Sequence, residues 1–257
     1  MFNMQIPKSF FNSLPQTKLI LKKRLAIGGL MLCLIAGLHS PAIALEPTTI
    51  IYELELDSER FGKATLGRIE TQLSQDGQQY SVATYTKAQG MAAILVGNFT
   101  ESCEFKVVAG RAVSQHYSGG RPEKTEYLVG FDWDARKVNF NDKETLDMPQ
   151  GYLVDNCNMP FALSLLQDQN IKETIYIVDG KKTRIRGYRF KTKSTEIINT
   201  KIGSLETIKI ELERELKPEK TLTLWLSKKH HFLPVKMQEK REERITTMQV
   251  TEYSADT

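Results

Sequence analysis

The sequence predicts a mainly β fold: an antiparallel meander that forms a curved sheet, an open barrel or two packed β lobes, with one or two short helices. Two observations carry this prediction. Apolar and polar residues alternate along many segments, with the period of two that marks half-buried strands. Turn residues separate these segments at the spacing of an antiparallel meander, rather than that of alternating strands and helices.

The opening strand shows the alternation most clearly. Ile50, Tyr52 and two further apolar residues fall on one face of an extended segment, while acidic residues alternate with them on the other. After a second run, Asp76-Gly77 predicts a tight hairpin turn. Further strands are expected at 104–108, 112–117, 125–132 and 137–140, and then at 174–178, 183–193, 195–202, 205–215, 221–227, 233–242 and 245–253.

Two short helices are expected, and both are interpreted as plugs that cover a sheet face. Residues 90–96 are apolar, although a buried strand would give the same pattern. Residues 159–167 follow Asn158, a predicted N-cap, and carry Pro160 in the first turn.

Residues 1–44 are typical of a secretory signal peptide with cleavage after Ala44. Basic residues precede the apolar segment 25–38, and Ala42-Ile43-Ala44 gives a small-x-small cleavage pattern. The alternative is a retained N-terminal membrane anchor, but 14 apolar residues are short for a span. We therefore predict a protein exported to the periplasm of a Gram-negative bacterium. Residues 45–257 are predicted to form one β-rich domain, with a division into two lobes near 149–158 left open.

The charge balance argues against nucleic-acid binding. The first 44 residues hold five of the 35 basic residues and no acidic residue, so the remainder has 30 basic against 31 acidic residues. A general nucleic-acid-binding protein normally has a basic excess. No nucleic-acid partner is therefore expected.

Two cysteines follow the predicted signal peptide. In an oxidising compartment Cys103 and Cys157 can form a disulfide, and two buried free thiols are the alternative. No Cys-x-x-Cys motif is present, which argues against a redox enzyme.

The densest basic segment, 181–193, carries seven basic residues with two interleaved aromatic residues. An anionic-ligand surface is one interpretation, with Arg184, Arg186, Arg189 and Lys191 as its residues. A charge-paired outer face is the other, because Glu211 and Glu213 follow on a later predicted strand.

No catalytic, metal or cofactor site is predicted. His230 and His231 are adjacent and would point to opposite faces of an extended chain, so we interpret them as turn residues. Ser227 lacks a Gly-x-Ser-x-Gly context. The carboxylate pair Glu53 and Glu55 would suit glycoside chemistry, but alternation along a solvated strand predicts the same pattern.

With these segments in view, the chain resembles the domain of unknown function 3108 family of exported bacterial proteins. Four segments carry the resemblance: 61–64, 131–138, 178–190, and the motif formed by Trp225, Ser227, Pro234 and Val235. An acidic residue is expected in the turn after Ser227, but Lys228 and Lys229 occupy it. The resemblance implies a β-rich periplasmic protein and no established activity.

The leading functional hypothesis is a non-catalytic binding or envelope-maintenance protein that holds an apolar ligand, either an acyl chain or a peptide, in a β groove. Its expected contacts are the apolar face of the opening strands and the segment 90–96. The alternatives are a hydrolase acting on cell-envelope polymers and a module that binds peptides at a sheet edge.

Overall fold

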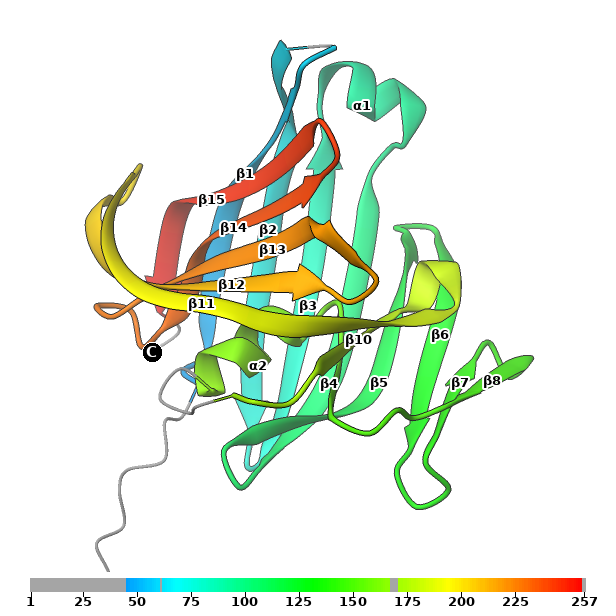
Figure 1. Cartoon of the computed structure of the whole chain (residues 1–257). Coiled ribbons are helices and arrows are strands. Elements are labelled where there is room, and N and C mark those ends of the chain that lie inside the picture. The colour runs from blue at the N-terminus through cyan, green and yellow to red at the C-terminus, as the bar shows by residue number, and fades with distance from the viewer. Residues whose placement is uncertain (1–44, 61, 167–170, 256–257) are drawn as a thin grey trace, which may run out of the picture. The chain divides into compact units, whose positions relative to one another are not determined.

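The computed structural model of the protein describes residues 45–60, 62–166 and 171–255, which form one compact unit. The predicted signal peptide lies outside the described residues. The described chain folds into a single open curved sheet of 15 strands (Figure 1). This confirms the predicted curved antiparallel sheet, one of the arrangements that the alternating pattern allows.

The sheet is built from two consecutive halves of the chain. The first half contains β1 (Thr48–Ser58), β2 (Gly62–Asp76), β3 (Gln79–Ala88), β4 (Phe99–Val108), β5 (Arg111–Arg121), β6 (Lys124–Asp132), β7 (Lys137–Phe140) and β8 (Glu144–Asp147). The second half contains β9 (Tyr152–Asp155), β10 (Ile175–Asp179), β11 (Arg184–Thr200), β12 (Gly203–Arg214), β13 (Lys217–Ser227), β14 (Leu233–Arg241) and β15 (Arg244–Ala255). Within each half, every strand pairs with its neighbours in sequence, and the halves join where β1 pairs with β15.

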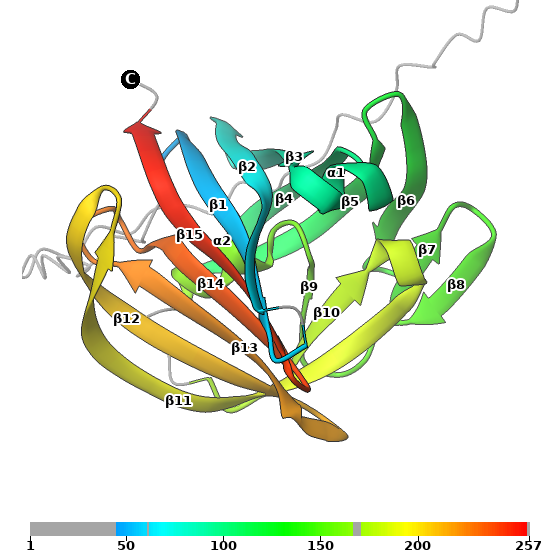
Figure 2. The same ribbon diagram turned by 90° about the horizontal axis from the view of Figure 1, so that it is seen from above.

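The chain therefore runs outward from β1 at the centre of the strand order to β8 at one end. It then crosses to β9 at the other end and returns to the centre at β15. β8 lies at one end of the strand order and β9 at the other, so residues 148–151 carry the chain between the two ends. Because the sheet curls, β9 lies against β5 of the first half (Figure 2). One expected boundary is wrong: the segments 183–193 and 195–202 form a single strand, β11, whose curvature keeps it paired with β12.

β9 and β10 are the exception to the antiparallel pattern, because they pair in parallel. A parallel pair needs a crossover connection, and α2 (Met159–Leu165) lies within it. Every residue of α2 is buried, and the helix contacts β5, β9 and β14. The predicted plug at 159–167 is thus confirmed, although the helix ends two residues earlier.

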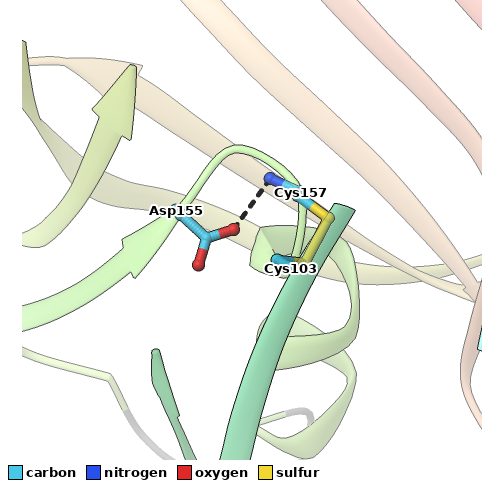
Figure 3. Close-up of side chains that lie close together, drawn as sticks. All are labelled: Cys103, Asp155 and Cys157. Carbon is cyan, nitrogen blue, oxygen red and sulfur yellow. Dashed lines mark hydrogen bonds between the residues drawn. A yellow bond between two sulfur atoms is a disulfide. The ribbon is translucent and has the colours of Figure 1, made fainter. Parts of the chain in front are cut away.

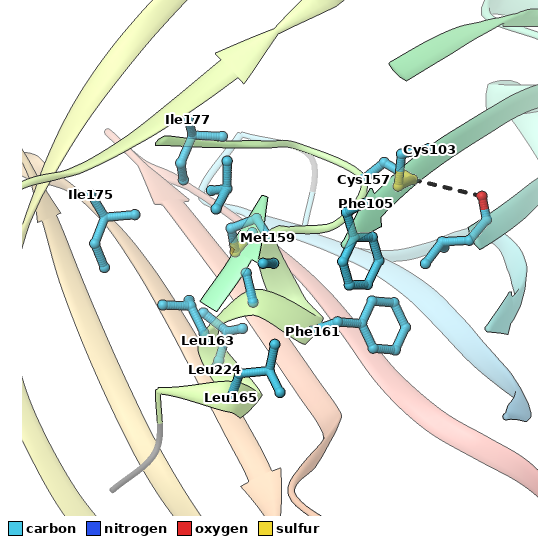
Figure 4. Close-up of a cluster of buried hydrophobic side chains, with 14 of the residues drawn as sticks. Cys103, Phe105, Cys157, Met159, Phe161, Leu163, Leu165, Ile175, Ile177 and Leu224 are labelled. Atoms are coloured by element: carbon cyan, nitrogen blue, oxygen red, sulfur yellow. Dashed lines mark hydrogen bonds between the residues drawn. A yellow bond between two sulfur atoms is a disulfide. The ribbon is translucent and has the colours of Figure 1, made fainter. Parts of the chain in front are cut away.

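The interior is apolar and is built around α2. Met159, Phe161, Leu163 and Leu165 project into a cluster that includes Phe105 of β4, Leu224 of β13, and Ile175 and Ile177 of β10 (Figure 4). Side chains from both halves of the sheet therefore bury their apolar faces on one short helix. That burial supplies the main favourable free energy of folding.

The other expected helix is present, but its surroundings differ from the prediction. α1 (Gly90–Leu95) has no buried residue, and Met91, Ile94 and Leu95 are 68–79 % exposed. It lies at the end of β3 rather than over a sheet face, so the interpretation of this segment as a plug is wrong (Figure 1). Among the described residues, neither helix has the length and apolarity that a membrane span requires.

Candidate functional site

Cys103 and Cys157 form a disulfide in the structure, with their Cα atoms 6.0 Å apart. Cys103 lies on β4, and Cys157 lies in the segment between β9 and α2 (Figure 3). The bond therefore ties the start of the buried helix to the first half of the sheet. Both cysteines are buried, which gives the disulfide a structural role.

A buried carboxylate stands beside the disulfide. Asp155 accepts the Ser114 hydroxyl at 2.7 Å and the backbone N–H groups of Cys157 and Asn158 at 3.0 and 2.8 Å. Burial raises the pKa of Asp155 to about 7, although these three hydrogen bonds oppose the rise. Asn158 donates to Ser114 at 2.7 Å instead of capping α2, so its predicted capping hydrogen bond is not made. Ser114, Asp155 and Asn158 are each 0 % exposed, so the network is closed to a ligand.

A second cluster, largely buried, lies where the two halves of the sheet meet across the curl. The Glu101 carboxylate accepts the hydroxyl groups of Tyr117 and Tyr127 at 2.6 and 2.7 Å. Burial raises the pKa of Glu101, and the two tyrosine hydrogen bonds oppose it. The turn after β10 packs on this cluster, because a Cβ at Gly180 would meet the Tyr127 ring at 2.5 Å.

The predicted anionic-ligand residues all have acidic partners. Arg184 and Arg186 both pair with Asp179. The cross-strand partners expected from the sequence also occur: Arg189 lies 3.5 Å from Glu213, and Lys191 lies 2.8 Å from Glu211. A bound anion would have to compete with these carboxylates, so the geometry favours the charge-paired interpretation of this face.

The Trp225 motif is packed into the sheet. Trp225 is 5 % exposed, its indole N–H donates to Glu196, and the amines of Lys209 and Lys236 lie 5.3 and 4.8 Å from its ring centre. The Pro234 carbonyl accepts the Tyr52 hydroxyl at 2.7 Å. These contacts position β13 and β14.

The other residues of the motif are also enclosed. Val235 and Ser227 are buried, and the Ser227 hydroxyl has no hydrogen-bond partner among the described residues. The turn predicted around the two histidines is present between β13 and β14. His230 packs against the Tyr253 ring in a tilted arrangement, while His231 lies 3.3 Å from Glu46, so neither supports Ser227 as a nucleophile.

The paired carboxylates Glu53 and Glu55 are engaged in surface ion pairs. Glu53 lies 2.9 Å from the amine of Lys201, and Glu55 lies 3.1 Å from that of Lys63. Each carboxylate thus has a separate cationic partner, as expected for a solvated strand face.

A different feature hollows the solvent-facing side of β2 to β6. Two adjoining hollows of about 390 and 520 Å³ share Ala83, Ser102 and Ser118. We call their combined surface the outer trough. The first hollow adds Glu70, Gln72, Thr84, Tyr85, Thr100, Glu101, Gly119 and Thr125. The second adds Ser81, Val82, Cys103, Glu104, His116, Tyr117, Leu128, Val129, Gly130 and Asp142.

Strand register explains the trough. Ala83 pairs with Ser102, Ser102 with Ser118, and Ser118 with Leu128, so small side chains form a row across β3, β4 and β5. The Ser102 and Ser118 hydroxyl groups lie 2.9 Å apart. Larger exposed side chains, Tyr85 at 39 % and Leu128 at 55 %, stand beside this row. The low floor and the raised sides together produce the hollow.

The trough was missed by the sequence analysis. Ser81, Ala83, Ser102 and Ser118 alternate with buried neighbours and thus look like ordinary outward positions of strands. The sequence signal that could have indicated the trough is the small size of these four side chains, because outward strand positions usually carry longer polar side chains. The sequence does not give the register that places them side by side.

Comparisons with known proteins bear first on the fold. A crystal structure described as a "Beta-barrel-like Protein of Domain of Unknown Function DUF1849" from Brucella abortus is 10% identical, with 82% of this chain and 98% of that chain covered and a TM-score of 0.54. At this identity the likeness concerns the fold alone. A search of curated proteins gives no match.

Two further structures share less of the geometry. One is a "putative lipoprotein" from Parabacteroides distasonis, 12% identical, with 82% of this chain and 96% of that chain covered and a TM-score of 0.37. The other is a lipoprotein-sorting protein domain of Vibrio parahaemolyticus, described as putative and outer membrane, 12% identical, with coverages of 82% and 86% and a TM-score of 0.28. TM-scores this low carry no argument about this chain.

The family of the chain follows from a match to a family model. The family model "Protein of unknown function (DUF3108)" matches residues 52–243, which include β2 to β14, the disulfide, the outer trough and the Trp225 motif. This is the family that the motif residues resemble. The chain therefore belongs to the DUF3108 family.

Proposed function

We propose that the protein is a non-catalytic binding protein of the bacterial cell envelope, exported to the periplasm, and that its ligand lies in the outer trough. The observation that carries this proposal is the row Ala83, Ser102 and Ser118, sunk between the exposed Tyr85 and Leu128. A concave surface with apolar sides and convergent hydroxyl groups is the usual form of a binding site. The predicted signal peptide supports export.

The inner face of the sheet is a poorer candidate. The apolar residues of the opening strand, such as Ile50 and Tyr52, are each 2 % exposed, and α2 packs between the two halves of the sheet. An acyl chain would have to displace this helix, together with the disulfide and the Asp155 network that precede it. We therefore place the ligand on the outer side of the sheet instead of in an inner groove.

Hydrolysis of an envelope polymer is the alternative that the trough itself raises, because His116, Glu104 and serines, among them Ser102 and Ser118, line it. A nucleophilic serine needs a base within hydrogen-bonding reach. Among the described residues, His116 hydrogen-bonds to neither serine, and Ser102 and Ser118 bond to each other. Binding without chemistry thus fits this geometry better.

The test is native mass spectrometry of the full chain, expressed in its own host and extracted gently from the periplasm. We expect a co-purified ligand with the wild type and with Ser194→Trp, a control at an exposed serine of β11 outside the trough. Ser102→Trp should fill the trough and abolish the extra mass. A ligand that persists in Ser102→Trp, or an empty wild-type protein, would contradict the proposal.

A further inference from the structure

We infer that the occupant of the outer trough is an extended, basic peptide segment. This inference rests on the proposed binding function and adds the chemical class of the ligand. It starts from the charges that line the trough. Glu70, Glu104 and Asp142 are exposed, and no lysine or arginine lines either hollow.

These three carboxylates have no ion-pair partner among the described residues, in contrast to acidic residues elsewhere on the sheet. Glu55, Glu206 and Glu211 each lie within about 3 Å of a lysine amine, at 3.1, 2.6 and 2.8 Å. The basic residues nearest to these carboxylates in sequence, Arg68, Lys106 and Lys143, line neither hollow, and Arg68 pairs with Glu252. The trough therefore carries uncompensated negative charge.

The carboxylates are spread over the trough instead of meeting at one point. Glu70 lies on β2, Glu104 on β4, and Asp142 in the turn between β7 and β8. Such an arrangement suits several amines spaced along one chain better than a single metal ion, whose ligands must converge. It also disfavours phosphate-bearing lipids, because like charges repel.

The dimensions fit a short extended chain. The row from Gln72 to Leu128 crosses five neighbouring strands, β2 to β6. Strands lie about 4.8 Å apart, so the row is about 19 Å long, and an extended peptide rising about 3.3 Å per residue would place about six residues along it. Figure 1 shows these five strands side by side.

The remaining lining groups match a peptide. The hydroxyl groups of Ser102 and Ser118 can donate to and accept from a peptide backbone. Tyr85 and Leu128 offer apolar contacts for alternate side chains, and Tyr85 can also receive a cation on its ring. We therefore expect alternating basic and apolar residues in the preferred sequence.

The experiment is a titration of the full chain with three fluorescent seven-residue peptides in which valine alternates with lysine, glutamine or glutamate. The lysine peptide should bind most tightly, and its affinity should fall with added salt. The triple variant Glu70→Gln, Glu104→Gln, Asp142→Asn should weaken that binding about tenfold, because each exposed charge pair contributes modestly. The matched control Glu219→Gln, Glu243→Gln, Asp134→Asn, at exposed carboxylates outside the trough, should bind like the wild type.

The outcomes separate this inference from the proposed function. If the glutamine or glutamate peptide binds as tightly as the lysine peptide, and Ser102→Trp abolishes that binding, the trough binds peptides but the basic class is wrong. If anionic phosphatidylglycerol vesicles bind and no peptide does, a lipid replaces the peptide. If Ser102→Trp leaves lysine-peptide binding intact, the peptide binds elsewhere and the inference fails.

Discussion

At the scale of single residues, the most unusual group is Asp155. Burial raises the pKa of this aspartate to about 7, so its ionisation costs more free energy in the folded protein than in the unfolded chain. Its carboxylate accepts hydrogen bonds from the Ser114 hydroxyl and from the backbone N–H groups of Cys157 and Asn158. They fix the chain that leads into α2.

The raised pKa predicts a pH dependence of stability. A carboxyl whose pKa is higher in the folded than in the unfolded state favours folding at low pH, and this contribution is lost as the pH rises from about 4 to about 7. The full difference corresponds to about 4 kcal/mol. Urea unfolding of the wild type and of Asp155→Asn at pH 4 and pH 8 should show a clearly smaller loss in the variant. If the wild type and the variant lose the same free energy of unfolding between pH 4 and pH 8, Asp155 does not titrate in this way.

At the scale of elements, the two helices have opposite roles despite similar apolar sequences. α2 is surrounded by both halves of the sheet, whereas α1 exposes Met91, Ile94 and Leu95 at the end of a hairpin. The composition of a six- or seven-residue segment does not separate these cases. What separates them is the crossover between β9 and β10, which carries α2 across the inner face.

This contrast gives a matched pair of substitutions. Phe161→Ala removes a side chain that is 2 % exposed and should lower the free energy of unfolding by about 3–5 kcal/mol. Leu95→Ala removes one that is 73 % exposed and should change it by less than about 0.5 kcal/mol. Urea titrations followed by tryptophan fluorescence would measure both. Equal effects would mean that α2 is not the centre of the core.

The sequence predicts the strands well because each depends on a local alternation. The segment around Ile50 and Tyr52, the Asp76-Gly77 turn and the strands 104–108 to 137–140 are all present. Contacts between distant segments could not be predicted, since register across strands is not a local property. The distance that decides between a Cys103–Cys157 bond and two free thiols, the row containing Ser102 and the pairing of β1 with β15 all belong to this second group.

At the scale of the whole described unit, the disulfide Cys103–Cys157 closes a loop with a sequence separation of 54 residues. It connects β4 to the chain before α2, and so restrains the approach of β9 to β5 on the inner side of the curl. It thereby reinforces a contact between two sheet regions that do not pair directly. The strand pairing alone leaves the sheet open.

Removing the bond should therefore destabilise the fold measurably. The double variant Cys103→Ala, Cys157→Ala should lose about 4 kcal/mol in the chain-entropy model, or somewhat less if the unfolded state is compact. Wild type unfolded in the presence of a thiol reductant should show a similar decrease. Unchanged urea midpoints in both experiments would contradict the assigned role.

The pairing of β1 with β15 has a consequence for how the protein is made. When the ribosome has completed the first half of the chain, β1 still presents an open row of backbone donors and acceptors, and its partner β15 is synthesised only after the other described strands. Such an edge can recruit a strand from another chain, and closure between distant segments is slow. During biogenesis the nascent polypeptide would thus depend on holding factors until its final strand arrives.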